Sequence, residues 1–135
     1  ARNAGVITAD EFAVFQNAGY MGLYGGMTVD DIHRKKNLEV GQKILDYMGS
    51  TELIANLFRI SQTEEKLRKD GVDSADTATA VHYKVGSEVR EAIEKIGGTM
   101  PEDLPTPEKS IAQLEKEQLQ RLKQQALDGQ LMLDE

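Results

Sequence analysis

The segment 49–71 constrains the fold more than any other, because it has the signals of one complete helix. Ser50 or Thr51 is placed to cap the first free amides, and Gly71 suits the left-handed turn that ends helices. Residues recurring at three- and four-residue steps predict a broad buried stripe, made of Leu53, Ile54, Leu57, Phe58, Ile60, Ser61, Glu64 and Leu67. Because other segments must cover such a stripe, the pattern predicts a compact, all-α, multi-helix domain.

A second long helix is predicted over residues 75–96, after a short polar loop. Ser74 is placed to cap it, and its helical periodicity comes from Ala78, Val81, His82, Val85, Val89, Ala92, Ile93 and Ile96. Gly86 in its middle is about 1 kcal/mol less favourable than Ala in a helix, so its expected use is close packing against another helix. The short loop predicts that helices 51–70 and 75–96 pack as an antiparallel pair.

The N-terminal part also predicts helices. Thr8 and Glu11 have the spacing of a capping box, which opens a helix that runs to about Asn17. The following stretch 19–26 is rich in glycine, which favours close approach of two backbones, with tyrosine and leucine side chains filling the junction. A phosphate-binding loop is the alternative, but no strand precedes this stretch and no Gly-Lys-Ser/Thr follows it. Thr28 is then placed to cap a short helix over 29–36.

The densest positive cluster of the chain comes at the end of that short helix, and it contrasts with a formal net charge of -7. It consists of Arg34, Lys35, Lys36 and, after another turn, Lys43. Cations at a helix C-terminus favour the helix dipole, which is one interpretation. The other is a contact patch for a phosphate backbone or an acidic partner, and these four residues are the candidate binding site.

The C-terminal part is predicted to stand apart from the core domain at 1–100. Residues 101–107 are proline-rich and predict a linker, after which Thr106 and Pro107 favour the start of a helix that ends at Gly129. Its broken apolar stripe holds Ile111, Leu114, Leu119, Leu122, Ala126 and Leu127, followed by an apolar end at Leu131, Met132 and Leu133. Residues 108–135 are therefore expected to pack on another copy, as a homo-oligomer, or to fold back across the central helix.

The composition excludes several kinds of chemistry. There is no cysteine, which excludes disulfides, thiol catalysis and thiolate metal sites and fits a cytoplasmic protein. No apolar run has the length of a membrane span. Neither of the two histidines, His33 and His82, lies in a metal-binding motif, and His82 is expected to be a hydrogen-bonded residue at the edge of the core. No catalytic residue, metal or cofactor is predicted.

Six segments of the chain resemble the DNA-damage-inducible protein D (DinD) family. They are DEFAVFQN at 10–17, GYMGLYGG at 19–26, QKILDYMGSTEL at 42–53, ANLFR at 55–59, QTEEKL at 62–67 and GGTMPEDLPTP at 97–107. They follow one another in order over residues 5–117, and the remaining C-terminal residues lie outside the resemblance.

The resemblance implies that this chain is the C-terminal domain of a DinD-like protein, without the N-terminal BRO-type domain that family members share with phage antirepressors. It implies a role in the bacterial SOS response to DNA damage, through interference with RecA filaments. No catalytic residues accompany the family, so we expect a non-enzymatic interaction domain that acts on RecA or RecA–DNA filaments. The alternatives are a metal-dependent nuclease or other DNA-processing enzyme, and an antirepressor-like regulatory oligomerisation domain.

Overall fold

The computed structural model describes the backbone of residues 7–133 and the side chains of residues 7–129. Within these residues the chain is all helical, which confirms the predicted fold class. Its elements, in order, are α1 (Ala9–Leu23), α2 (Val29–Lys35), the 3-10 helix η1 (Ile44–Tyr47), α3 (Ser50–Lys69), α4 (Ala75–Ile96), the 3-10 helix η2 (Pro101–Asp103) and α5 (Ile111–Leu133). Among the described helices, none combines the length and apolar character needed to cross a membrane.

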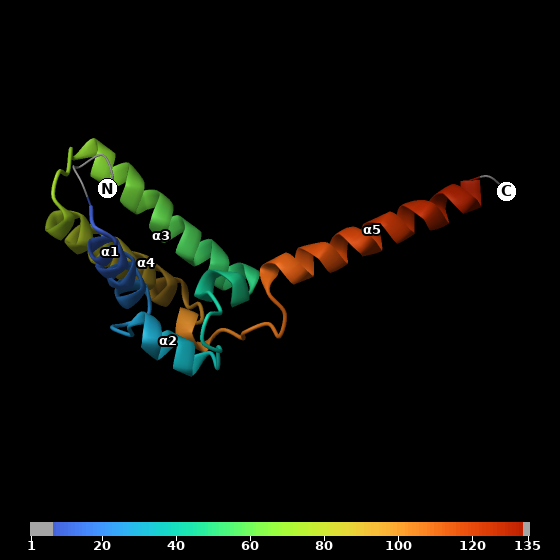
Figure 1. The fold of residues 1–135 in the computed structure, drawn as a ribbon, viewed down its shortest axis with the longest axis horizontal. Helices are drawn as coiled ribbons and strands as arrows, with labels where there is room; N and C mark the ends of the chain where they lie inside the picture. Colours follow the sequence, from blue (N-terminus) through green and yellow to red (C-terminus); the bar gives the residue numbers. More distant parts are fainter. Residues whose placement is uncertain (1–6, 134–135) are drawn as a thin grey trace.

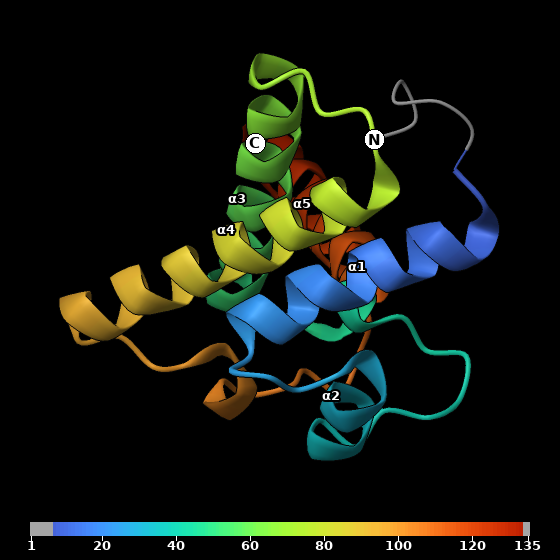
Figure 2. The same ribbon diagram turned by 90° about the vertical axis from the view of Figure 1, so that its left-hand side faces the viewer.

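Helices α1 to α4 form the body of the molecule, and α5 leaves it as a separate arm (Figure 1). In this view α3 runs toward the loop at 70–74, and α4 runs back from it. The prediction of two long helices that touch and are joined by a short loop is confirmed. However, α4 packs more extensively against α1 than against α3, and Figure 2 shows α3 crossing α4 obliquely.

Most helix starts follow the local sequence signals. Thr8 and Thr28 each form a capping box, and Ser74 Oγ accepts a hydrogen bond from the amide of Thr77. Helix α3 is the exception, since Gly49 is its N-cap and provides no side-chain cap. The prediction that Ser50 or Thr51 caps α3 is therefore wrong, because the helix already includes both residues in its first turn.

Helix α1 continues through the glycine-rich stretch to Leu23, beyond its predicted end near Asn17. The glycines serve the crossing of α1 and α4. A Cβ atom on Gly22 would lie 2.2 Å from the carbonyl oxygen of Tyr83, and one on Gly86 would lie 2.7 Å from that of Gly19. The predicted use of Gly86 in close helix packing is thus confirmed, and the small residues decide where α1 and α4 touch.

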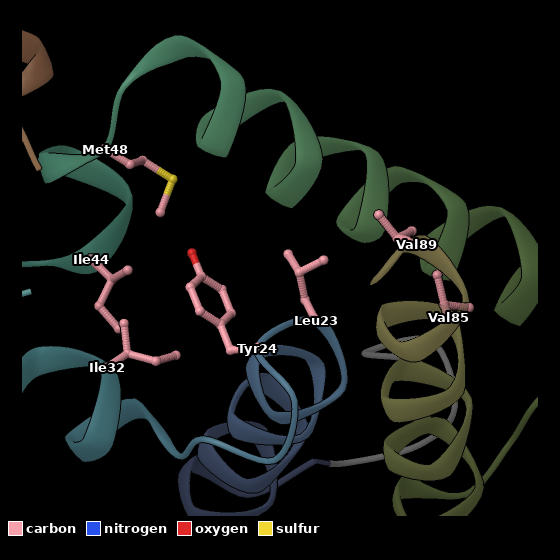
Figure 3. Close-up of a cluster of buried hydrophobic side chains, with 7 residues drawn as sticks. All are labelled: Leu23, Tyr24, Ile32, Ile44, Met48, Val85 and Val89. Atoms are coloured by element: carbon pink, nitrogen blue, oxygen red, sulfur yellow. The ribbon is translucent and has the colours of Figure 1, made fainter. Parts of the chain in front are cut away.

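The apolar core lies where α1, α2, η1 and α4 meet (Figure 3). It is a cluster of buried side chains from Leu23, Tyr24, Ile32, Ile44, Met48, Val85 and Val89. Tyr24 brings a hydroxyl into this cluster, and Figure 3 shows it directed toward Met48 and the start of α3. A buried hydroxyl needs a hydrogen-bond partner, so the core must contain polar groups as well.

The segment predicted as a linker is bound to the body over its first half. Pro101 is buried, and η2 makes polar contacts with α2 and α4 that are described below. Helix α5 begins at Ile111 instead of Pro107, after Ser110, whose Oγ accepts a hydrogen bond from the amide of Gln113. It also passes through Gly129, the predicted end. The side chains of the apolar end, Leu131, Met132 and Leu133, lie outside the described residues.

Candidate functional site

Helix α3 turns four polar residues inward and three large apolar residues outward. The side chains it buries are those of Glu52, Asn56, Arg59, Thr63 and Leu67. On the opposite side Ile54 is 66% exposed, Leu57 50% and Phe58 54%, and we call these three residues the α3 outer face. The predicted buried stripe is therefore wrong: Leu67 is buried and Leu53 and Ile60 are half-buried, but Ser61 and Glu64 are also exposed.

The inward polar residues are held by a chain of hydrogen bonds that begins at α4. Arg59 Nη1 lies 2.6 Å from His82 Nε2, and His82 Nδ1 lies 2.9 Å from the carbonyl oxygen of Phe15. Since a carbonyl only accepts, His82 carries its proton on Nδ1 and accepts from Arg59 through Nε2. Burial, helped by the charge of Arg59, lowers the pKa of His82 to about 4, so the ring is neutral at pH 7.

The chain of hydrogen bonds continues along α3 into the apolar core. Arg59 Nη2 donates to Asn56 Oδ1 at 2.8 Å, and Asn56 Nδ2 donates to the Tyr24 hydroxyl at 3.0 Å. Tyr24 in turn donates a short hydrogen bond to Glu52. Burial, together with this bond to the carboxylate, raises the pKa of Tyr24 far above its usual value. The Arg59 guanidinium also lies over the ring of Tyr20, 4.6 Å from its centroid.

The chain of hydrogen bonds ends at Lys36, which the sequence placed in the basic cluster. Its ammonium group lies 3.1 Å from Glu52 Oε1, 2.8 Å from the carbonyl oxygen of Pro101 and 2.6 Å from that of Leu104. These three acceptors use all the protons of the ammonium group. Lys36 is buried, so it is a structural residue and does not belong to a surface patch. We call the connected residues the polar network: Lys36, Glu52, Tyr24, Asn56, Arg59 and His82.

The other three predicted binding residues are exposed. Arg34 bonds to Asp31 within α2, Lys35 Nζ lies 3.7 Å from Asp103 Oδ1, and Lys43 precedes η1. Beside Lys35 is a hollow of about 490 Å³ whose wall also contains the carboxylates of Glu39, Glu102 and Glu108. The basic cluster is thus reduced to three surface cations, two of which are paired with carboxylates.

Arg90 of α4 makes a second polar connection to η2. Its two Nη atoms each lie 2.8 Å from an oxygen of Glu102, and Nη1 also donates to the carbonyl oxygen of Leu23 at 3.1 Å. A bidentate pair of this kind fixes geometry as well as charge. Arg90 therefore joins α4, the end of α1 and η2 at one point.

This arrangement uses most buried ionisable groups for holding helices together. Within the described side chains, no three His, Cys, Asp or Glu residues form a group that could hold a metal ion. The α3 outer face offers a different chemistry: from position 50 to position 62 the only ionisable residues are Glu52 and Arg59, and both are buried. The outward side of these turns is therefore uncharged and largely apolar, as in the core of a protein–protein interface.

Sequence reasoning missed the polar network, although one signal for it was present. Glu52, Asn56, Arg59 and Thr63 recur at the same helical spacing as the apolar stripe, on another side of the helix. The apolar pattern alone favoured the wrong side because hydrophobic residues are normally the buried ones.

The fold and the network define a class of protein: a helical scaffold with a polar interior and an exposed apolar helix face. The model of the DinD C-terminal domain family matches residues 1–114, and the chain belongs to that family. A curated relative, DNA damage-inducible protein D of Escherichia coli (strain K12), is 61% identical over 115 residues, covering 85% of this chain and 42% of the relative. The chain thus spans less than half of that relative. No solved structure gives a significant match.

Proposed function

We propose that this chain is a non-enzymatic interaction domain of the bacterial SOS response to DNA damage, and that it acts in the cytoplasm on RecA or RecA–DNA filaments. Membership of the DinD C-terminal domain family and the name of the E. coli relative support the link to DNA damage. The polar network is the structural observation that supports an interaction domain.

The network supports this proposal because its reactive side chains face one another. A general base must reach its substrate directly or through one water, whereas His82 is buried and bonded through both ring nitrogens. Glu52, the carboxylate nearest to it along the network, is held by Lys36 and Tyr24. These groups stabilise a fixed arrangement of helices, and the surface of that arrangement is left for binding.

The exposed cations provide a contact for the filament. Arg34 and Lys35 lie at the end of α2, and Lys43 lies at the start of η1. Contacts between such cations and DNA phosphates release counterions, so their affinity falls as the salt concentration rises. We therefore expect binding to RecA–DNA filaments to be stronger at low salt.

The experiment is a pull-down of this chain with RecA, with and without single-stranded DNA, at several salt concentrations. We expect retention on the filament, and weaker, less salt-dependent retention of the variant Arg34→Glu with Lys35→Glu. The matched control is Arg68→Glu with Lys69→Glu, which makes the same charge change at the far end of α3 (Figure 1). Equal retention of both variants and the native chain would mean that Arg34 and Lys35 are not part of the binding surface.

The enzymatic alternative has its own test. Incubation of the chain with single- and double-stranded DNA in the presence of Mg²⁺ or Mn²⁺ measures nuclease activity directly. We expect no cleavage above that of a preparation without the chain. Cleavage that follows the chain through purification would overturn the proposal in favour of a metal-dependent nuclease.

A further inference from the structure

We propose that two copies of this chain form a dimer in which α5 of each copy packs on the α3 outer face of the other. The proposal concerns assembly, and it stands whether or not the chain binds RecA. It is carried by two apolar surfaces of one chain, each of which lacks a cover in the described structure.

Helix α5 is the first of these surfaces. Its most extensive contact with the rest of the chain is at η1, near its first residue, and the remainder extends away from the body (Figure 1). Four large apolar side chains among its described residues are exposed, namely those of Leu114, Leu119, Leu122 and Leu127. A helix without tertiary contacts is marginally stable in water, so α5 requires a partner surface.

The α3 outer face is the second surface. Ile54, Leu57 and Phe58 lie on adjacent turns, and their average exposure is far above that of the core residues of the same chain. The inward side of these turns holds the buried charges of Glu52 and Arg59, so the outward side faces solvent with no charge of its own. An uncharged apolar helix face is the kind of surface on which another amphipathic helix packs.

The charges of α5 suit a second copy of this chain. Helix α5 has no net charge, whereas the formal net charge of the whole chain is -7. Its three cations are Lys116, Arg121 and Lys123, and its three carboxylates are Glu115, Glu117 and Asp128. Two acidic bodies repel each other, but a neutral arm approaches the body of a second copy without net repulsion. The arm and the uncharged α3 outer face are therefore compatible in charge.

The direction of α5 favours exchange between copies over a contact within one copy. The start of α5 contacts η1, which immediately precedes α3 in the chain. From these neighbouring starts α3 and α5 diverge, so α5 leads away from the α3 of its own chain (Figure 1). A two-fold axis that bisects the angle between α3 and α5 places α5 of each copy beside α3 of the other copy. Such an interface is isologous, and it closes at a dimer.

Sedimentation equilibrium of the full chain and its variants tests the assembly. We expect a dimer, and we expect Leu119→Asp with Leu122→Asp, or Ile54→Asp with Phe58→Asp, to weaken its Kd at least about tenfold, as loss of interface anchors does. Ile96→Asp is the matched control, since Ile96 is exposed at the end of α4, and it should remain dimeric. A monomeric native chain overturns the proposal, as does a dimer that α3 substitutions leave intact.

The absence of cysteine allows a direct test of which helices meet. A Leu57→Cys chain is mixed with a Leu122→Cys chain of different mass and oxidised with glutathione disulfide. A bond between them requires the two Cα atoms to come within about 7 Å, and it necessarily joins two copies. Val40→Cys, from an exposed loop position, replaces Leu57→Cys in the control mixture.

We expect the mixed disulfide to form several-fold more in the Leu57 mixture than in the control, and we expect few Leu122→Cys pairs. Equal yields in the two mixtures would overturn the proposal. A predominance of Leu122→Cys pairs would also overturn it, because it would indicate that α5 pairs with α5. The proposal would also be overturned if α5 substitutions abolished the dimer but no disulfide formed with position 57. In that case α5 would not pack on the α3 outer face of the second copy.

Discussion

Arg59 and His82 are hydrogen-bonded across the contact between α3 and α4, and α1 passes close enough to require a glycine there. A Cβ atom on Gly19 would lie 2.3 Å from His82 Nε2 and 2.5 Å from Arg59 Nη1. The bond at 2.6 Å thus exists only because α1 leaves room for it. Three helices meet at this buried pair, and its protonation state is coupled to their packing.

The first prediction concerns the pH dependence of stability. In the folded chain the pKa of His82 is about 4, against an ordinary histidine value of 6.5, so between these values the unfolded chain binds more protons. The stability contributed by neutral His82 is therefore complete above about pH 6.5 and is lost as the pH falls toward 4. The loss is on the order of 3 kcal/mol. Urea unfolding of the native chain and of His82→Gln, from pH 4 to pH 7, measures it.

Comparison of the native chain with His82→Gln isolates the contribution of His82 to the pH dependence, because the carboxylates titrate in both proteins. His82→Gln should be less pH-dependent than the native chain over this interval. His33→Gln is the control, since His33 lies on α2 outside the polar network. If all three proteins showed the same slope, the histidine would not be held neutral by the fold.

The second prediction concerns the crossing of α1 and α4. Gly86→Ala should destabilise the chain by about 1–3 kcal/mol, because the added methyl group meets backbone atoms at 2.7 and 2.9 Å. This steric effect should outweigh the gain of about 1 kcal/mol that Ala brings to a helix. Gly129→Ala is the control, with nothing within 4 Å of its Cβ position, and it should raise the helicity of α5. Thermal unfolding followed by circular dichroism compares the two.

The third prediction tests the orientation of α3. Leu23→Ala should lower the free energy of unfolding by about 2–5 kcal/mol, because Leu23 is fully buried. Leu57→Ala makes the same chemical change on the α3 outer face, and in dilute protein its effect should stay within about 1 kcal/mol. Chemical denaturation of both variants gives the comparison. A loss at Leu57 as large as that at Leu23 would mean that Leu57 is buried and that α3 is rotated from this orientation.

The fourth prediction concerns the end of the polar network. Lys36→Met should destabilise the chain by about 3–5 kcal/mol, because it leaves the Glu52 carboxylate buried without its cation. Lys35→Met, at the neighbouring exposed position, should change stability by less than about 1 kcal/mol. Adding Glu52→Gln to Lys36→Met should recover part of the loss, and a double-mutant cycle measures this coupling. Purely additive effects would contradict the direct pairing of the two residues.

Local signals in the sequence predicted several helix starts and both ends of α4. The capping box at Thr8 and the caps at Thr28 and Ser74 depend on neighbouring residues only. The bounds of α4 are those predicted, and the function of Gly86 followed from its place in a helix. Such features could be predicted because their energetics involve contacts within a few residues along the chain.

The buried side of α3 and the place of Lys36 could not be predicted in the same way. Lys36 is stabilised by Glu52, Pro101 and Leu104, which lie 16 to 68 positions away in the sequence. A buried Arg59 likewise depends on Asn56 of its own helix, on His82 of α4 and on the ring of Tyr20. A hydrophobicity pattern contains no information on such partners, so it could not distinguish the buried Lys36 and Arg59 from surface cations.

The connection of η2 to the body has a mechanical consequence. A load applied along α5 reaches Leu104 and Glu102 before it reaches α4, since both precede α5 and follow α4 in the chain. There the hydrogen bond from Lys36 to Leu104 opposes it first, and the two bonds from Arg90 to Glu102 oppose it next. The last turn of α4 is thus shielded from tension, and the arm can be pulled without unwinding the helix that carries most of the α1 contact.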